Sequence, residues 1–251
     1  MMKRSFVAAA AVMPLLMVAG MAMAQNMRYG YIESKLNPHN FSNQGWADMQ
    51  ICKPCHTPHN AKPTVYSTRI WAHSITNASY TVDAAGTKVS AADKLDRVSR
   101  LCMSCHDGTV ALGDYAYSPD PTGGGSPGNG ATLGTDLSIN HPVGVTAAYS
   151  ATRTSFKPTI DTKDTAGTIT KKSAGIKTAT TAELPLVRVT IKDATGNITS
   201  DNFVVGCATC HHPHGTRTGD TTVNPPGSDP LPHLLRMPNT GSAMCLSCHN
   251  K

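Results

Sequence analysis

The chain has 251 residues, of which only 5% are aromatic, and it contains 21 glycines and 17 prolines. This composition is poor in the residues that build the hydrophobic core of an ordinary globular enzyme. The formal net charge of +6 is spread thinly, and its densest basic element beyond the amino terminus is the Lys171-Lys172 doublet, so the chain lacks the basic patch of a nucleic-acid-binding protein.

The amino terminus has the three parts of a secretory signal. A charged region (Lys3 and Arg4), an apolar stretch (6–18) and a small-residue cleavage site follow one another. We expect residues 1–24 to be a signal peptide, and the exported chain of about 227 residues to begin near Gln25. The apolar stretch is too short to span a bilayer and no later stretch qualifies, so no membrane span is expected in the mature chain. A retained amino-terminal anchor is the alternative.

Four copies of the motif Cys-x-x-Cys-His use all eight cysteines of the chain. The motif is typical of c-type haem attachment, in which two thiols bond covalently to one porphyrin and the adjacent imidazole becomes an axial ligand of its iron. The two-residue gap places both cysteines a helical turn apart, within reach of one macrocycle. The sequence therefore predicts four covalently bound c-type haems. The predicted attachment residues are Cys52, Cys55, Cys102, Cys105, Cys207, Cys210, Cys245 and Cys248, and the proximal iron ligands are His56, His106, His211 and His249.

Zinc binding and local disulfides are the two alternatives for these cysteines. Structural zinc sites combine two Cys-x-x-Cys pairs in one tetrahedral site, and nothing in that chemistry requires a histidine after every second cysteine. Four local disulfides leave the four histidines equally unexplained. Four repeats with no cysteine outside them, in a chain with a signal for export, favour haem.

Secondary structure is predicted to be sparse. Leu95, Val98 and Leu101 form an apolar stripe that favours a helix leading into the second motif. Further along the chain, alternating apolar residues favour a β-hairpin. The expected elements, in chain order, are a helix over 45–55, a helix beginning within 90–93, a glycine-rich loop over 119–130, hairpin strands over 186–191 and 198–205 joined by a turn over 193–197, and a helix over 242–249.

The motifs differ in pairs, and the differences repeat along the chain. The first and third motifs are followed three residues later by a further histidine (His59 and His214), whereas the second and fourth are not. The expected fold class is therefore mostly irregular chain with short helices around four stacked c-type haems, in two di-haem modules separated by a small β-hairpin insert. The predicted units are a signal peptide (1–24), a first di-haem module (25–118), a Gly/Thr-rich insert with the hairpin (119–205) and a second di-haem module (206–251).

Seven histidines lie outside the motifs, and such a surplus favours a histidine on both sides of each iron. His59 and His214 cannot fold back onto their own porphyrins, so each is predicted to bind the neighbouring haem. His141, before the second module, is the candidate for the third haem. His39 and His73 compete for a haem of the first module, and a histidine on the flexible amino-terminal segment has the further option of ligating a haem in an adjacent subunit.

The remaining candidate ligands are less favoured. His212 and His233 are predicted to be surface or supporting residues. Met49, Met237 and Met244 are available as ligands, and Met/His ligation raises the potential relative to bis-histidine ligation. Because histidine is so abundant, we expect bis-histidine sites.

The assembled motifs resemble a family of multihaem cytochromes with the paired Cys-x-x-Cys-His repeat. The matching segments are CKPCHTPHNA (52–61), WAH (71–73), LCMSCHDGTVA (101–111), NHPVG (140–144), CHHPHG (210–215) and CLSCHNK (245–251). They cover nearly the whole mature chain, although 145–205 matches only loosely. Four haems at this length are similar to the tetrahaem cytochromes that polymerise into extracellular filaments, the OmcE-like group. In that group a histidine of one subunit completes a haem site of the next, which would suit His39.

Electron transfer is the function that these features predict, with no enzymatic activity. The expected partners are further copies of the chain in a filament, other redox cytochromes and extracellular electron acceptors, at the cell surface or outside it. A soluble periplasmic electron shuttle is the alternative, and a reductase of small oxyanions is less favoured because it needs an iron with an open axial position. Eight propionates and four ferric centres bring the mature charge of +4 to about zero, so nucleic acid is excluded as a partner.

Overall fold

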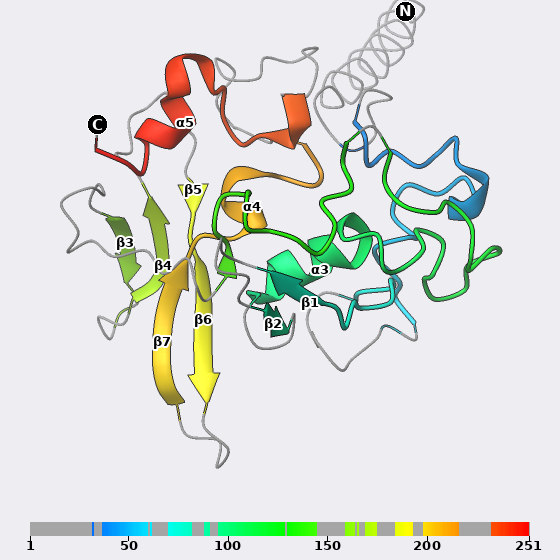
Figure 1. The fold of residues 1–251 in the computed structure, drawn as a ribbon, viewed down its shortest axis with the longest axis horizontal. Helices are drawn as coiled ribbons and strands as arrows, with labels where there is room; N and C mark the ends of the chain where they lie inside the picture. The colour runs from blue at the N-terminus through cyan, green and yellow to red at the C-terminus, as the bar shows by residue number, and fades with distance from the viewer. Residues whose placement is uncertain are drawn as a thin grey trace, which may run out of the picture.

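A computed structural model gives the fold of the chain as short elements joined by long irregular segments (Figure 1). The predicted signal peptide and the predicted hairpin turn over 193–197 lie outside the described residues. Within the described residues, no helix has the length and hydropathy needed to cross a bilayer. The structure describes residues 32, 37–59, 61, 70–81, 88–90, 95–128, 130–144, 159–163, 165, 169–174, 184–192, 198–215 and 232–250.

Three small antiparallel sheets make up the strand content. One pairs β1 with β2, one orders its strands β3-β4-β5, and one is the β6-β7 hairpin that projects away from the body of the molecule (Figure 1). The strand bounds are β1 Ser79–Thr81, β2 Lys88–Ser90, β3 Thr159–Lys163, β4 Ile169–Ala174, β5 Leu184–Pro185, β6 Val187–Lys192 and β7 Ile198–Val204.

The hairpin expected in the insert is present, because β6 pairs with β7 in a register that sets Val187 opposite Val204. Strands β3, β4 and β5 were not predicted. The strand sequences Thr-Ile-Asp-Thr-Lys (β3) and Ile-Thr-Lys-Lys-Ser-Ala (β4) carry too few apolar residues for the alternation that identifies a half-buried strand. Their pairing depends on neighbouring strands rather than on a hydrophobic pattern of their own.

The helices are short, and two of the predicted bounds are wrong. The predicted helix over 45–55 is reduced to the 3-10 turn η1 Gly45–Ala47, because the chain turns into the left-handed region at Asp48 and Met49 (φ 55° and 53°). The predicted start within 90–93 is also wrong, since Ser90 belongs to β2 and helix α3 begins at Arg97. The helical bounds are η1 Gly45–Ala47, α3 Arg97–His106, α4 Cys207–Cys210, η3 Pro232–Leu234, η4 Thr240–Ser242 and α5 Ala243–Leu246.

Buried apolar side chains gather in two small clusters rather than in one core. The first contains Tyr80, Leu95, Met103 and Leu137, and it packs β1 against α3. The second joins the insert to the carboxyl-terminal segment; it contains Leu184, Leu186 and Met237, with Phe203, Val205, Ala243, Met244 and Cys248 packed against them. Figure 1 shows α5 beside the ends of β4 and β5, in agreement with this second cluster.

A polar contact joins α3 to α4, and so joins the first half of the chain to the second. Asp96 accepts hydrogen bonds from the amides of Val98 and Ser99 at 3.0 Å each, which caps the amino terminus of α3. The Ser99 hydroxyl donates to the same carboxylate and accepts from the Cys207 amide at 2.9 Å. At Gly206 an added Cβ would lie 2.6 Å from an Asp96 carboxylate oxygen, so glycine permits this close approach.

Candidate haem-binding sites

Helix α3 presents the second motif on a regular turn. The capped start at Asp96 leaves ten residues of helix, with Cys102 and Cys105 three positions apart on one face and His106 as the last residue. Both cysteines are half-buried, while Leu101, Met103 and Ser104 are buried beside them. The helix therefore directs both thiols to one side, as attachment to a single macrocycle requires.

The other three motifs form the same turn without a long helix. In each, the amide of the motif histidine donates to the carbonyl of the first cysteine, at 2.8 Å (His56 to Cys52), 3.0 Å (His211 to Cys207) and 2.9 Å (His249 to Cys245). This is the i to i−4 bond of one α-helical turn. The predicted spacing of one turn between the two cysteines therefore holds at all four motifs.

No two of the eight cysteines are joined by a disulfide, and cysteines of consecutive motifs interact with one another. Burial is the main cause that raises the pKa of Cys105, and the charge of Cys55 adds to it. A hydrogen bond between the Cys102 and Cys207 thiols raises the pKa of the first and lowers that of the second. Burial is also the main cause that raises the pKa of Cys210, and the charges of Cys207 and Cys245 add to it.

These contacts connect the first motif to the second, the second to the third and the third to the fourth. Within the described residues, no group of three or more His, Cys, Asp or Glu side chains is arranged to hold a metal ion by itself.

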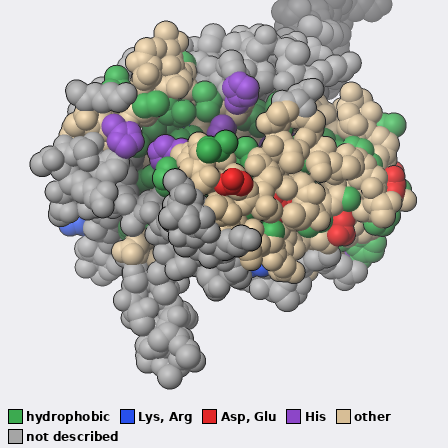
Figure 2. All heavy atoms as spheres, viewed as in Figure 1, with side chains coloured by type: hydrophobic (Ala, Val, Ile, Leu, Met, Phe, Trp, Pro, Cys, Tyr) green, Lys and Arg blue, Asp and Glu red, His purple; other side chains and the backbone are tan. Residues whose placement is uncertain are grey.

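Three motif histidines lie opposite a histidine from outside the motifs. The ring centres are 6.0 Å apart for His39 and His106, 6.0 Å for His56 and His214, and 6.4 Å for His141 and His249. Several histidine side chains are visible among apolar atoms on the face shown in Figure 2. The pairs join segments that are far apart in the sequence, so the fold creates them and local structure does not.

The separation within each pair suits two imidazoles on opposite sides of one metal ion. Imidazole nitrogens bond transition metals at about 2.0–2.1 Å, and each bonded nitrogen lies about 1.1 Å from its ring centre, so the two ring centres would lie roughly 6 Å apart. The measured separations of 6.0–6.4 Å match this value. Because an axial haem site needs this arrangement, the residues present fit bis-histidine haem.

Backbone carbonyls orient the rings of four histidines. Nδ1 of His106 donates to Ala131 O at 2.8 Å, and Nδ1 of His39 donates to Pro213 O at 3.0 Å. The same kind of bond joins His141 Nδ1 to Pro142 O at 2.9 Å and His211 Nδ1 to His233 O at 2.7 Å. A carbonyl can only accept, so the proton is on Nδ1 and Nε2 is left with its lone pair. Metal-binding histidines characteristically have this arrangement.

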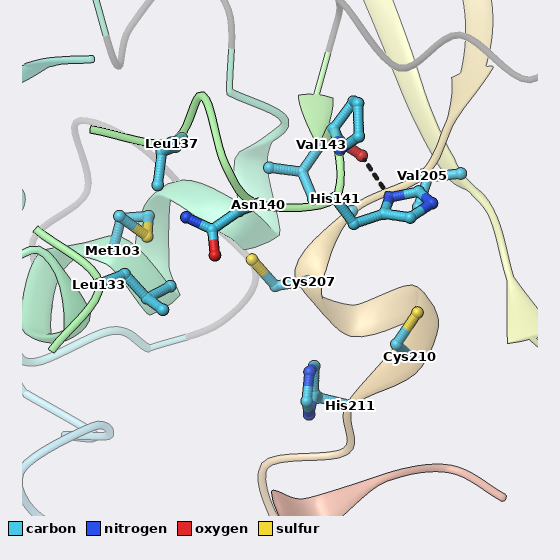
Figure 3. Close-up of a pocket in the computed structure, with 12 residues that line it drawn as sticks. Met103, Leu133, Leu137, Asn140, His141, Val143, Val205, Cys207, Cys210 and His211 are labelled. Atoms are coloured by element: carbon cyan, nitrogen blue, oxygen red, sulfur yellow. Dashed lines mark hydrogen bonds between the residues drawn. The ribbon is translucent and has the colours of Figure 1, made fainter. Parts of the chain in front are cut away.

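A cavity of about 220 Å³ opens beside the third motif (Figure 3). Cys207, Cys210 and His211 line it from α4 and the residue that follows. The rest of the lining is mostly apolar and comes from α3, from the loop over 130–144 and from the end of β7: Met103, Leu133, Leu137, Asn140, His141, Pro142, Val143, Val205 and Gly206. A covalently attached porphyrin needs an apolar surface beside two thiols and an imidazole, and this cavity provides one.

His141, predicted to serve the third haem, lies between the third and fourth motifs. It lines the cavity beside the third motif together with Cys207, Cys210 and His211. The centre of its ring also lies 6.4 Å from that of His249 in the fourth motif.

The two competing histidines of the first module have different surroundings. His39 is half-buried beside His106, and burial lowers its pKa to about 4, which favours the neutral ring. His73 is 1% exposed, and both of its nitrogens face carbonyls: Nδ1 lies 2.8 Å from Ser74 O, and Nε2 lies 3.1 Å from Ala111 O. His73 Nε2 also lies 3.5 Å from Cys105 Sγ of the second motif. Among the described residues the ring of His39 contacts that of a motif histidine, His106, and the ring of His73 does not, so the geometry favours His39.

The remaining candidates are placed as follows. His59 is exposed, and within the described part of the chain its ring makes no contact with a motif histidine. His212 lies beside His214, with ring centres 5.8 Å apart, and burial lowers its pKa to about 4. His233 is exposed and acts through its carbonyl, which accepts from His211.

The methionines named as alternative ligands differ in exposure. Met237 is buried in the second cluster, where its sulfur accepts from the Ser247 hydroxyl at 3.6 Å, and Met244 packs against the same cluster. Met49 is 58% exposed. Met103, inside the second motif, is in the first cluster and lines the cavity beside the third motif.

Polar groups near the motifs include three that the sequence did not indicate. Trp71 packs edge-on against His56 with ring centres 6.3 Å apart, and its Nε1 is buried without a partner among the described residues. Arg100 Nε is likewise buried and unpartnered among those residues, and Arg236 Nε donates to Ala208 O at 2.6 Å. Such donors suit the propionates of bound haem.

Compared with known families and with curated proteins, the chain matches no family model and no curated sequence.

Proposed function

We propose that this protein transfers electrons through four covalently attached c-type haems. The observation that best supports the proposal is the set of three histidine pairs, each joining a motif histidine to a histidine outside the motifs at 6.0–6.4 Å. When bound, each haem supplies an iron that takes up and releases one electron reversibly. The chain attaches the porphyrins through its eight cysteines and orients the iron ligands.

The ring contacts lead to a specific set of axial ligands. We assign the fourth pair from the internal repeat of the first and third motifs. His214 follows the third motif by three residues and faces His56 of the first. His59 follows the first motif by three residues, so we assign it to the iron of the third. His73 is left out because, among the described residues, the ring of His39 and not that of His73 contacts the ring of a motif histidine. Three proposed pairs rest on ring contacts: His56 with His214, His106 with His39, and His249 with His141. The fourth, His211 with His59, rests on the internal repeat alone.

The proposed ligand set has no open axial position, which separates an electron carrier from a reductase. We expect the dithionite-reduced protein to show no change in its absorption spectrum under carbon monoxide, because each iron already has two imidazoles. Optical titration with carbon monoxide measures this. Binding of one carbon monoxide per chain would instead support reduction of a small oxyanion at one site.

We also propose that the protein works outside the cell, as an extracellular filament that exports respiratory electrons to other redox cytochromes and extracellular acceptors. The support is the amino-terminal sequence typical of a secretory signal and the resemblance to filament-forming tetrahaem cytochromes. Cys52 of the first motif and Cys245 of the fourth are exposed, which suits electron exchange between copies at both ends of the series of sites.

A soluble shuttle in the periplasm is the second candidate, and one observation favours it. His39 faces His106 of its own chain, so the second motif needs no histidine from a neighbouring subunit. Electron microscopy of material sheared from cells, together with sedimentation of the purified protein, distinguishes the two. We expect filaments and fast-sedimenting polymer. Monomers at all concentrations, recovered from the periplasmic fraction, would contradict the filament and support the shuttle.

A further inference from the structure

Asp107 is a buried carboxylate directly after the second motif, and its partners are all neutral donors. It is 4% exposed and follows His106, the last residue of α3. Its Oδ2 accepts from the Thr76 hydroxyl at 2.6 Å and from the Tyr80 hydroxyl at 2.7 Å. Its Oδ1 accepts from the amide and hydroxyl of Thr109 at 2.7 and 2.8 Å. Four donors on two oxygens are the arrangement that suits an anionic carboxylate.

Among the described residues no cation forms an ion pair with Asp107. Arg100, which lies in the same region, directs its guanidinium to Thr76 O and Asn77 Oδ1, both at 3.4 Å. Thr76 and Tyr80 are both fully buried, so little water screens the charge. A charge in these surroundings acts over a longer distance than one at the surface.

The position of this charge ties it to the second site. Consecutive Cα atoms are about 3.8 Å apart, so the Asp107 backbone directly adjoins that of the predicted iron ligand His106. The carboxylate also holds β1 and the end of α3 together through Tyr80. It is therefore fixed relative to the ligand, and its field on the site does not average away through side-chain motion.

The internal repeat provides a comparison within the same chain. In the fourth motif, the residue after the ligand histidine is Asn250, which is exposed and uncharged. The second and fourth motifs are otherwise closely similar, with the sequences Leu-Cys-Met-Ser-Cys-His and Met-Cys-Leu-Ser-Cys-His. The two repeat-related sites thus differ by one buried negative charge.

We propose that the Asp107 carboxylate lowers the reduction potential of the second haem, and so differentiates this site from its repeat-related partner at the fourth motif. The inference depends on the proposed function, because it requires haem at these motifs. A fixed negative charge stabilises the ferric state, which carries one more positive charge than the ferrous state. Burial of the site acts in the opposite direction, by favouring the less charged ferrous state. The test must therefore change the charge within one site.

The primary test is Asp107→Asn in the full-length haem-loaded protein, followed by an optical redox titration. One of the four midpoint potentials should rise while the other three stay in place. At a fixed ambient potential the ratio of oxidised to reduced haem at that site should fall about tenfold, equivalent to about 59 mV for a one-electron couple. Unchanged potentials at all four sites would overturn the inference.

Tyr80→Phe is the matched control, because it removes one hydrogen bond from the network and retains the charge. A carboxylate that accepts one hydrogen bond fewer keeps more of its negative charge unshielded. The midpoint potential of the second haem should therefore stay the same or fall. If Asp107 served only to hold β1 against α3, both variants would loosen the site in the same way. An equal rise in both variants would therefore assign a structural role and overturn the inference.

Asn250→Asp is the complementary variant, and it decides the matter if Asp107→Asn fails to fold. It adds a charge after the fourth motif at an exposed position. The midpoint potential of the fourth haem should fall. The fall should be smaller than the rise that Asp107→Asn causes at the second haem, because water screens the added charge. No fall would contradict the inference. Four attached haems with unmoved potentials overturn this inference alone, whereas a wild-type protein without haem overturns the proposed function and this inference with it.

Discussion

Intact-mass analysis of the exported protein should give the polypeptide beginning near Gln25 plus four haems, and the Cys102→Ala/Cys105→Ala variant should give one haem fewer. The two thiols lie on one face of α3, and both thioether bonds of the second haem depend on them. The other three motifs have their own cysteine pairs and should keep their haems. Absorption of the denatured, reduced protein should decrease by one quarter, in agreement with the mass.

Met103→Leu is the control for this experiment, because it changes the second motif and leaves its cysteines intact. Met103 is buried in the first cluster, and an exchange of similar volume costs less than about 1.5 kcal/mol. This variant should retain four haems. Fewer than four haems on the wild-type chain, or stoichiometric zinc bound by the cysteines, would contradict the attachment of haem at every motif.

His39→Gly should open one of the four sites, and His73→Asn should open none. His39 faces His106 at 6.0 Å, so its removal leaves the second iron with one axial imidazole and a free position. The reduced variant should then bind one carbon monoxide per chain, and one quarter of the optical signal should become high-spin. Added imidazole should restore the low-spin spectrum by occupying the vacated position.

His73→Asn should affect stability and leave ligation intact. His73 is 1% exposed and lies against the carbonyls of Ser74 and Ala111, and the loss of a partner for a buried polar group costs about 1–3 kcal/mol. The midpoint of thermal unfolding should therefore fall while all four haems stay low-spin. A site opened by His73→Asn and unaffected by His39→Gly would reverse the proposed assignment.

The sequence predicted the parts of the sites that depend on local structure. The spacing of each motif encodes one helical turn, which the bonds from His56, His211 and His249 to their first cysteines show. The alternation in the insert likewise identified the β6-β7 hairpin. The start of α3 was misplaced because Ser90 and Asp96 are both good capping residues, and only the fold determines which of them caps the helix.

The pairing of histidines could not be predicted, because it depends on contacts between distant segments. Chain order suggested His141 for the third motif, whose cavity it lines, but its contact with His249 of the fourth motif depends on the return of the carboxyl-terminal segment. The groups that orient the rings were also invisible in the sequence. Ala131 and Pro213 act through backbone carbonyls, which every residue has, so no residue type marks them.

The histidine pairs also have a consequence for how the chain matures. Once ligated, each pair becomes a cross-link that closes a long loop, and cross-links over loops of this size stabilise by about 4–5 kcal/mol in the chain-entropy view. The loops differ in when they can close. His39 and His106 both lie in the first half of the chain, whereas His56 must wait for His214. In the proposed export, which would begin at the amino terminus, the second motif could therefore be completed while the first still awaits a partner from the last quarter of the polypeptide.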